Sequence, residues 1–354
     1  MKSRVAYIDL LKVIAIFGVI TIHISSSALY QFGIASIDWY FSVFWASIVR
    51  WSVPVFLMCS GVLFLNPDKV ISIKRIFTKY LPRIVTALVF WAIMYEMFDV
   101  FKVFHNTGRI DSAIIRTAIK NILTCNTHFH LYYLYIIILI YALVPIIKVF
   151  SNAAIKHQME YALFAWIIFG IIYPFAIKFY PLNLLKGIVV QYSISMAYSA
   201  IGYFVLGHYF HKYNLTKRTT YIIYALGIIG LAATLYGTIA VSTFLQAVNT
   251  MFLEGMSPNV AAMAAGLFLF AKNLHSNADN ELSRKTQIIG YISKGSFCVY
   301  LVHDFFNIAF RTFKFDTVLN PLFSIPLLSL LNLILSLSVY LVLSKIPVVK
   351  KYLI

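Results

Sequence analysis

The sequence predicts an all-α membrane protein, a polytopic bundle of about ten transmembrane helices, and three observations support this fold class. Hydrophobic residues make up 61% of the 354 residues, and charged residues only 12%. The mean hydropathy is +0.84, which implies more apolar surface than one soluble globule can bury. Apolar runs of about 18 or more residues recur along the chain, and each is long enough to cross a bilayer as a helix. We therefore predict one integral-membrane domain over residues 1–354.

Ten apolar runs qualify as spans. They cover residues 7–25, 43–65, 81–99, 131–150, 159–179, 192–210, 220–244, 253–271, 287–311 and 319–345. Arg50 and Pro54 interrupt the second run, so residues 39–49 either continue that span or form an interfacial segment before a shorter one. The loop after the third span contains Ile110–Leu123, an amphipathic stretch typical of a helix on the outer surface.

The first span, Tyr7–His23, is unusual because it carries Asp9, Lys12 and His23. Ionisable side chains in hydrocarbon are costly and usually mark a functional site. Lys12 and His23 are eleven residues apart, which places them within about 20° on a helical wheel and roughly 16 Å apart along the axis. One helix face therefore carries two polar groups at two depths. A signal peptide cleaved near Ser25 is the alternative, but Asp9 and Lys12 fit an apolar signal segment poorly.

The basic residues predict the orientation. When the ten spans alternate, eighteen of the 29 Lys and Arg residues fall on the side of the N-terminus, and eight fall on the opposite side. Basic loops face the cytoplasm, so both termini are expected there. The net charge of +17 is then a topology signal, and nucleic-acid binding is excluded. The cysteines Cys59, Cys125 and Cys298 have no metal-like spacing, so neither a disulfide framework nor a metal site is predicted.

Several side chains are candidates for chemistry. A neutral imidazole has a pKa of about 6.5 and can take a proton from an alcohol, so His23 is either a general base or a histidine that bonds between helices. Lys12 either attracts a phosphate or thioester carbonyl, or pairs with Asp9 three residues earlier. The basic segment Lys74–Arg83 is either a topology signal or a docking place for the phosphates of a cofactor. Ser60-Gly61 lets helix backbones approach closely.

Together these residues resemble the acyltransferase family 3 membrane proteins, and the resemblance covers essentially the whole chain. Six motifs occur in the family's order: Asp9 to Lys12 with His23; Val53 to Phe56 with Ser60-Gly61; Arg75 to Arg83; His130 to Leu134 with Tyr141 and Pro145; Gly202 to Phe204 with Gly207; and Ser293 to His303. The sequence is most similar to the subgroup that contains the enterobacterial common antigen O-acetyltransferase.

The resemblance implies transfer of an acyl group, usually acetyl, from cytoplasmic acetyl-CoA to a hydroxyl of a lipid-linked or nascent cell-envelope glycan. It implies a bacterial inner-membrane enzyme that meets acyl-CoA, glycan and membrane lipids, with acyl-CoA as a donor substrate and no bound cofactor. His23 is the expected base, with Asp9 and Lys12 beside it. Family members typically have Arg at the position of Lys12, and Lys keeps the charge but loses the two-pronged donor geometry.

Other residues follow from the same resemblance. Arg50, Arg75 and Arg83 match basic positions of the family pattern and are expected to bind CoA phosphates or to organise the core. The further site candidates are Ser60, His130, Tyr300 and His303. Two other functions stay open on the sequence alone, a transporter or flippase for a lipid-linked glycan and a structural subunit of a glycan-synthesis complex.

Overall fold

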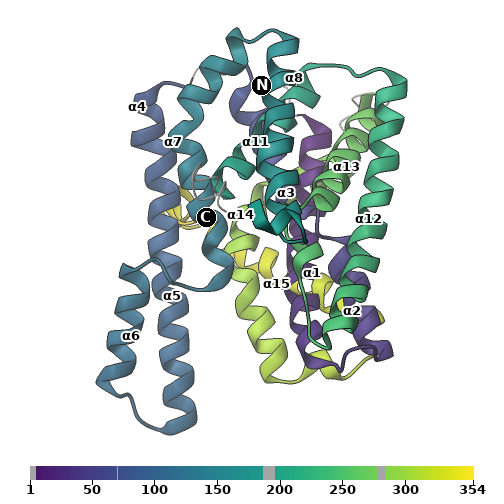
Figure 1. Cartoon of the computed structure of the whole chain (residues 1–354). Coiled ribbons are helices and arrows are strands. Elements are labelled where there is room, and N and C mark those ends of the chain that lie inside the picture. Colours follow the sequence, from purple (N-terminus) through teal and green to yellow (C-terminus); the bar gives the residue numbers. More distant parts are fainter. Residues whose placement is uncertain (1–4, 70, 186–195, 277–283) are drawn as a thin grey trace. The chain divides into compact units, whose positions relative to one another are not determined.

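The computed structural model describes residues 5–69, 71–185, 196–276 and 284–354, and every regular element among them is a helix (Figure 1). The all-α prediction is therefore confirmed for the described residues. The chain divides into two compact units. One contains Met1–Lys69 and Ile146–Ser338, and the other contains Val70–Pro145 and Val339–Ile354.

The first unit holds most of the long helices. They are α1 (Ala6–Gln31), α2 (Ile37–Ile48), α3 (Ser52–Leu65), the end of α7 (Tyr132–Ala153), α8 (Lys156–Trp166), α9 (Tyr173–Ala176), α11 (Met196–Lys212), α12 (Lys217–Leu245), α13 (Pro258–Ser276), α14 (Arg284–Thr312) and most of α15 (Pro321–Leu343). Short π and 3-10 segments join some of them: η3 (Ile167–Ile172), η4 (Leu182–Leu185), η5 (Met251–Leu253) and η6 (Phe315–Thr317).

Among the described residues, eight helical segments are long and apolar enough to cross a membrane. They are Ala6–Gln31, Ile37–Leu65, Ile73–Thr107, Phe129–Ala153, Lys156–Ala176, Lys217–Leu245, Met251–His275 and Pro321–Leu343. Two more predicted spans fall on α11 and α14. The described part of α11 has 17 residues, and the start of its predicted span lies outside the described residues. Because α14 carries Lys294, Asp304 and Arg311, it is less apolar, and the count of ten spans stays a prediction.

The second predicted span is broken where the sequence indicated. α2 ends at Ile48 and α3 begins at Ser52, so Arg50 lies in the turn between two helices. Pro54 lies in the first turn of α3, where its missing N–H costs no helical hydrogen bond. The residues before Arg50 form a separate helix, as one of the two sequence alternatives proposed.

Two glycines bring α3 and α11 into backbone contact. A β-carbon on Gly61 would lie 1.8 Å from the Phe204 carbonyl oxygen, and one on Gly207 would lie 2.2 Å from the Met58 carbonyl oxygen. No side chain fits at either position, so the predicted close approach at Gly61 is confirmed. Small residues allow such approaches between membrane helices. Gly61 and Gly207 are therefore packing residues.

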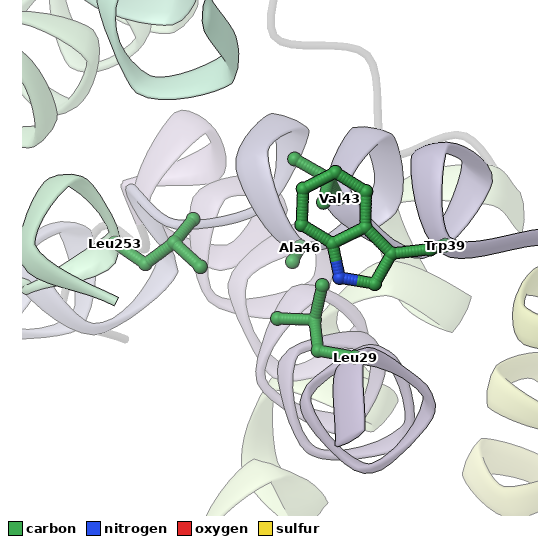
Figure 2. Packing of buried hydrophobic residues seen from close by; sticks show 5 residues of the cluster. All are labelled: Leu29, Trp39, Val43, Ala46 and Leu253. Atoms are coloured by element: carbon green, nitrogen blue, oxygen red, sulfur yellow. The ribbon is translucent and has the colours of Figure 1, made fainter. Parts of the chain in front are cut away.

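A cluster of buried side chains holds α2 against one end of α1. Trp39, Val43 and Ala46 of α2 pack on Leu29 of α1 and on Leu253 of η5 (Figure 2). All five side chains are buried. The packing fixes the last turns of α1, the helix that carries His23.

One end of the first unit gathers helix C-termini. Three lysines donate to main-chain oxygens there: Lys148 to Phe64 (3.3 Å), Lys212 to Ser151 (3.2 Å) and Lys272 to Phe210 (2.6 Å). A cation at a helix C-terminus interacts favourably with the last carbonyls and with the helix dipole. The ends of α3, α7 and α11 therefore meet at one end of the unit, together with α13, which carries Lys272.

The start of α1 lies at the same end, because the Tyr7 hydroxyl and Nδ1 of His211 share a hydrogen bond of 2.7 Å. At the opposite end, Arg311 of α14 donates to Ser27 of α1 (2.9 Å), and Asn320, before α15, donates to Asp38 of α2 (2.7 Å). These helices therefore alternate in direction as the predicted threading requires. That the lysine-rich end faces the cytoplasm stays a prediction from the charge distribution.

The second unit is built on one long helix. It contains α4 (Ile73–Arg75), η1 (Ile76–Tyr80), α5 (Leu81–Thr107), α6 (Ser112–Leu123), η2 (Phe129–Leu131), the start of α7 and α16 (Pro347–Tyr352). Gly108 ends α5 with a φ of 68°, and the Asp111 side chain caps α6. The amphipathic stretch predicted at Ile110–Leu123 is therefore a helix, and its place on the membrane surface stays a prediction.

Candidate active site

The polar residues of α1 face α14. Two of the predicted catalytic residues, Asp9 and Lys12, meet Ser293 of α14. The Ser293 hydroxyl donates to Oδ1 of Asp9 at 2.6 Å, and Nζ of Lys12 donates to the Ser293 carbonyl oxygen at 3.2 Å. A half-buried carboxylate and an ammonium group thus converge on one residue of a neighbouring helix. Ser293 begins the last of the six family motifs, but it was not a predicted site residue.

His23 lies further along the same face and meets His303. The two ring centroids are 5.1 Å apart, and the ring planes are inclined by 35°. His23 is half-buried, whereas His303 is fully buried. The predicted candidates His23 and His303 therefore form one site although 280 residues separate them in the sequence.

The tautomer of His303 follows from its hydrogen bond. Its Nδ1 lies 2.7 Å from the Tyr300 carbonyl oxygen, and a carbonyl can only accept, so Nδ1 carries the hydrogen. Nε2 is then the nitrogen whose lone pair can take a proton. The predicted candidate Tyr300 contributes its main chain to this arrangement.

A buried polar network surrounds His303. Asn332 of α15 donates to the His303 carbonyl oxygen at 2.8 Å and to Oδ1 of Asn307 at 2.7 Å. Asn307 donates to Oδ1 of Asp304 at 3.1 Å, and Ser336 donates to Oδ1 of Asn332 at 2.9 Å. None of these four residues was a predicted site residue. A buried aspartate and asparagine within apolar runs were the available signal.

An apolar layer separates the two polar positions of α1. Ile16 and Val19 lie on the same helix face, between Lys12 and His23. Their side chains are 0% and 4% exposed. Because polar groups in hydrocarbon need internal partners, the two positions are distinct sites at two depths and not one continuous polar channel along α1.

The turn that contains Arg50 packs beside this apolar layer. A β-carbon on Gly18 of α1 would lie 2.0 Å from Oγ of Ser52, the first residue of α3, and 3.6 Å from the β-carbon of Val49, so the turn and α1 are in direct contact. Gly18 is about 7.5 Å along the axis from His23. Arg50 is therefore a cation at a depth between Lys12 and His23. Ser60, another predicted candidate, donates to the carbonyl of Phe56 in its own helix at 3.0 Å, which gives its hydroxyl a structural use.

The remaining predicted residues belong to the second unit. Arg83 donates to the main-chain oxygen of Ile354, and the Arg75 guanidinium lies 5.8 Å from the centroid of the Tyr80 ring. Both arginines are solvent-exposed. His130 is buried, and its Nδ1 lies 2.9 Å from Nδ1 of His128. The structure thus brings Asp9, Lys12, His23, Tyr300 and His303 together along one face of α1, and it places Arg75, Arg83 and His130 in the other unit.

Comparison with known proteins agrees with the resemblance seen in the sequence. A protein-family model described as an acyltransferase domain, that of the acyltransferase 3 family, matches residues 5–341. No curated protein and no solved structure matches the chain. The match covers nearly all of the first unit, residues 70–145 of the second unit and every predicted site residue.

Proposed function

The chain belongs to the acyltransferase 3 family, and from this premise we propose that it transfers an acetyl group from acetyl-CoA to a hydroxyl of a cell-envelope glycan. The family match makes the protein a membrane acyltransferase. The donor, the acetyl group and the glycan acceptor are our proposal, supported by the site residues and by the finer resemblance to the enterobacterial common antigen O-acetyltransferase subgroup. We also propose that the membrane is the bacterial inner membrane.

The observation that carries the proposal is a half-buried histidine on a membrane helix with its ring against a second, fully buried histidine. A general base must be reachable by its substrate and held in one orientation. His23 meets the first requirement through its partial exposure. Its contact with the His303 ring, at 5.1 Å between centroids, contributes to the second.

The reaction needs one proton to move. The glycan O–H bond breaks as the new O–C bond to the acyl carbon forms, and His23 takes the proton. The C–S bond of the thioester then breaks, and the CoA thiolate leaves with a proton returned from the imidazolium. The charge on the thioester oxygen in between requires a fixed cation or hydrogen-bond donor.

Arg50 suits the developing negative charge better than Lys12 does. Reacting groups must lie within about 3–3.5 Å of one another, and Lys12 is roughly 16 Å along the helix from His23. Arg50 lies in the turn that packs on Gly18, at about half that axial distance or less. We assign to Arg50 the stabilisation of the negative charge on the thioester oxygen. We assign to Lys12 the binding of the acyl-CoA donor near the N-terminal end of α1.

The donor phosphates are proposed to bind the exposed basic segment of the second unit. Lys74, Arg75, Lys79 and Arg83 are all exposed. Charge-assisted hydrogen bonds from arginine to phosphate are among the stronger polar contacts. This proposal agrees with the predicted cytoplasmic placement of the segment, where acetyl-CoA is available.

The test is a deletion strain complemented with variants of the gene. Mass spectrometry of its envelope glycan should show an acetyl increment with the wild-type gene and none with His23→Ala at equal protein abundance. A general base contributes about 10² to 10⁴ in rate. His157→Ala is a control, because His157 is an exposed residue that bonds Glu160. Glycan that is acetylated normally but not exported in the deletion strain would overturn the proposal in favour of a transporter.

A further inference from the structure

His303 is held more tightly than a packing residue needs. Its side chain is 0% exposed. Its Nδ1 donates to the Tyr300 carbonyl oxygen at 2.7 Å, which fixes the plane of the ring as well as its tautomer. One face of this fixed ring meets His23. The more exposed histidine therefore rests against a histidine that has one orientation.

Asn332 extends this restraint to a third helix. Its amide nitrogen donates to the carbonyl of His303 at 2.8 Å and to Asn307 at 2.7 Å, and its amide oxygen accepts from Ser336 at 2.9 Å. Asn332 is 0% exposed. Hydrogen bonds between membrane helices stabilise proteins only modestly. A polar network of this extent at His303 therefore indicates a positional requirement on that residue.

We propose that His303 is a positioning residue for His23 and that Asn332 acts through His303. This inference rests on the proposed function of His23 as the base. The His23 side chain is half-buried, so it can adopt more than one rotamer unless a neighbour restrains it. The fixed His303 ring restrains it by contact and directs a nitrogen of His23 to the glycan hydroxyl.

A positioning role predicts which atoms of residue 303 are required for activity. The hydroxyl proton passes to His23 and then to the CoA thiolate, and His303 exchanges no proton. An aromatic ring at position 303, held in place by the Nδ1 hydrogen bond, is therefore necessary, whereas Nε2 is not. A proton relay through Nε2 of His303 would require the nitrogen, and this difference separates the two roles.

The test uses the purified full-length protein in lipid nanodiscs, with acetyl-CoA and glycan extracted from the deletion strain, and measures release of the CoA thiol. His303→Ala should lower kcat by about 10- to 100-fold, the range expected for a misplaced catalytic group. KM for acetyl-CoA should stay within about twofold, because the donor contacts are untouched. His303→Phe should raise kcat at least about threefold above that of His303→Ala, because phenylalanine keeps the ring although it loses the Nδ1 hydrogen bond.

Asn332→Leu tests the second part of the inference. It should lower kcat in the wild-type background and should have no further effect in the His303→Ala background, since residues that act in series are not additive. It also keeps the proposal testable if His303→Ala does not accumulate. His275→Ala is the matched control, because His275 also bonds its own helix, with Nδ1 3.2 Å from the Ala271 carbonyl oxygen.

Three results would overturn the inference. They are His303→Phe as inactive as His303→Ala, His303→Ala with the wild-type kcat, or additive losses in the Asn332 double variant. If the wild-type protein releases no CoA with this glycan while the glycan of the wild-type strain is not acetylated, the proposed function fails and the inference fails with it. Normal wild-type turnover with any of the three results refutes the positioning role alone.

Discussion

Replacing Gly61 with alanine should destabilise the protein by about 2–3 kcal/mol, at the upper end of the usual range for overpacking. The added β-carbon would lie 1.8 Å from the Phe204 carbonyl oxygen and 2.7 Å from its carbonyl carbon. A close carbon–oxygen contact is about 3.3 Å, so α11 would have to move away from α3 by about 1.5 Å. The obstacle is backbone, and a rotamer change cannot relieve it.

The contact on the other side of the interface makes this movement more costly. Gly207 of α11 faces the Met58 backbone, where a β-carbon would lie 2.2 Å from the carbonyl oxygen. The two glycines therefore define one interface with close contacts in both directions, and separating the helices at Gly61 also loosens them at Gly207. A loss of about 2.8 kcal/mol lowers the ratio of folded to unfolded protein about a hundredfold.

The assay is unfolding of the purified protein in mixed micelles as the fraction of sodium dodecyl sulfate is raised, followed by tryptophan fluorescence. Gly33→Ala is the matched control, because a β-carbon there meets nothing within 4 Å. It should unfold within about 0.5 kcal/mol of wild type, as surface substitutions generally do. The reasoning is refuted if Gly61→Ala is as stable as wild type, or if Gly33→Ala loses as much as Gly61→Ala.

Three further predictions concern topology and substrate binding. Alkaline phosphatase fused after Ile354 should be inactive because the charge distribution places that end in the cytoplasm, and an active fusion would contradict the ten-span threading. Arg75→Ala and Arg83→Ala should each raise KM for acetyl-CoA about tenfold or more, because each removes one charge-assisted hydrogen bond. Lys120→Ala on α6 is the control and should leave KM unchanged. If KM is also unchanged in both arginine variants, the basic segment serves only as a topology signal. Lys12→Arg should stay active because the guanidinium keeps the charge and can still donate to the main chain of α14, and an inactive but abundant protein would show that a compact ammonium group is required there.

The sequence was sufficient to predict α1 and its polar face. A helical period alone places Lys12 and His23 on one face, and their chemistry in an apolar run marks them. The break at Arg50 was also predictable, because a charge and a proline interrupt an apolar run. Each of these features depends only on residues that are near one another in the chain.

The partners of that face were not predictable in the same way. Ser293 and His303 lie about 280 residues from Asp9 and His23, and no local pattern pairs one membrane helix with another. Lipid-facing and buried surfaces of a membrane helix are both apolar, so periodicity does not reveal which side packs. Asn332 shows the limit most clearly. It is a single polar residue in an apolar run, and only the packed structure shows that it bonds the carbonyl of His303.

The two depths on α1 suit a reaction whose substrates approach from opposite sides of a membrane. Lys12 lies near the lysine-rich end of the first unit, and His23 lies toward the opposite end. Ile16 and Val19 fill the same face between them and are buried. A nucleotide cannot pass such an apolar layer, because its phosphates would lose their hydration without replacement. The pantetheine arm of CoA is slender and carries the acyl group at its tip, so under the proposed function the arm alone reaches toward His23 and the phosphates stay on the side of Lys12. Under the same proposal, this layer excludes water from the thioester, which favours transfer to a sugar hydroxyl over hydrolysis.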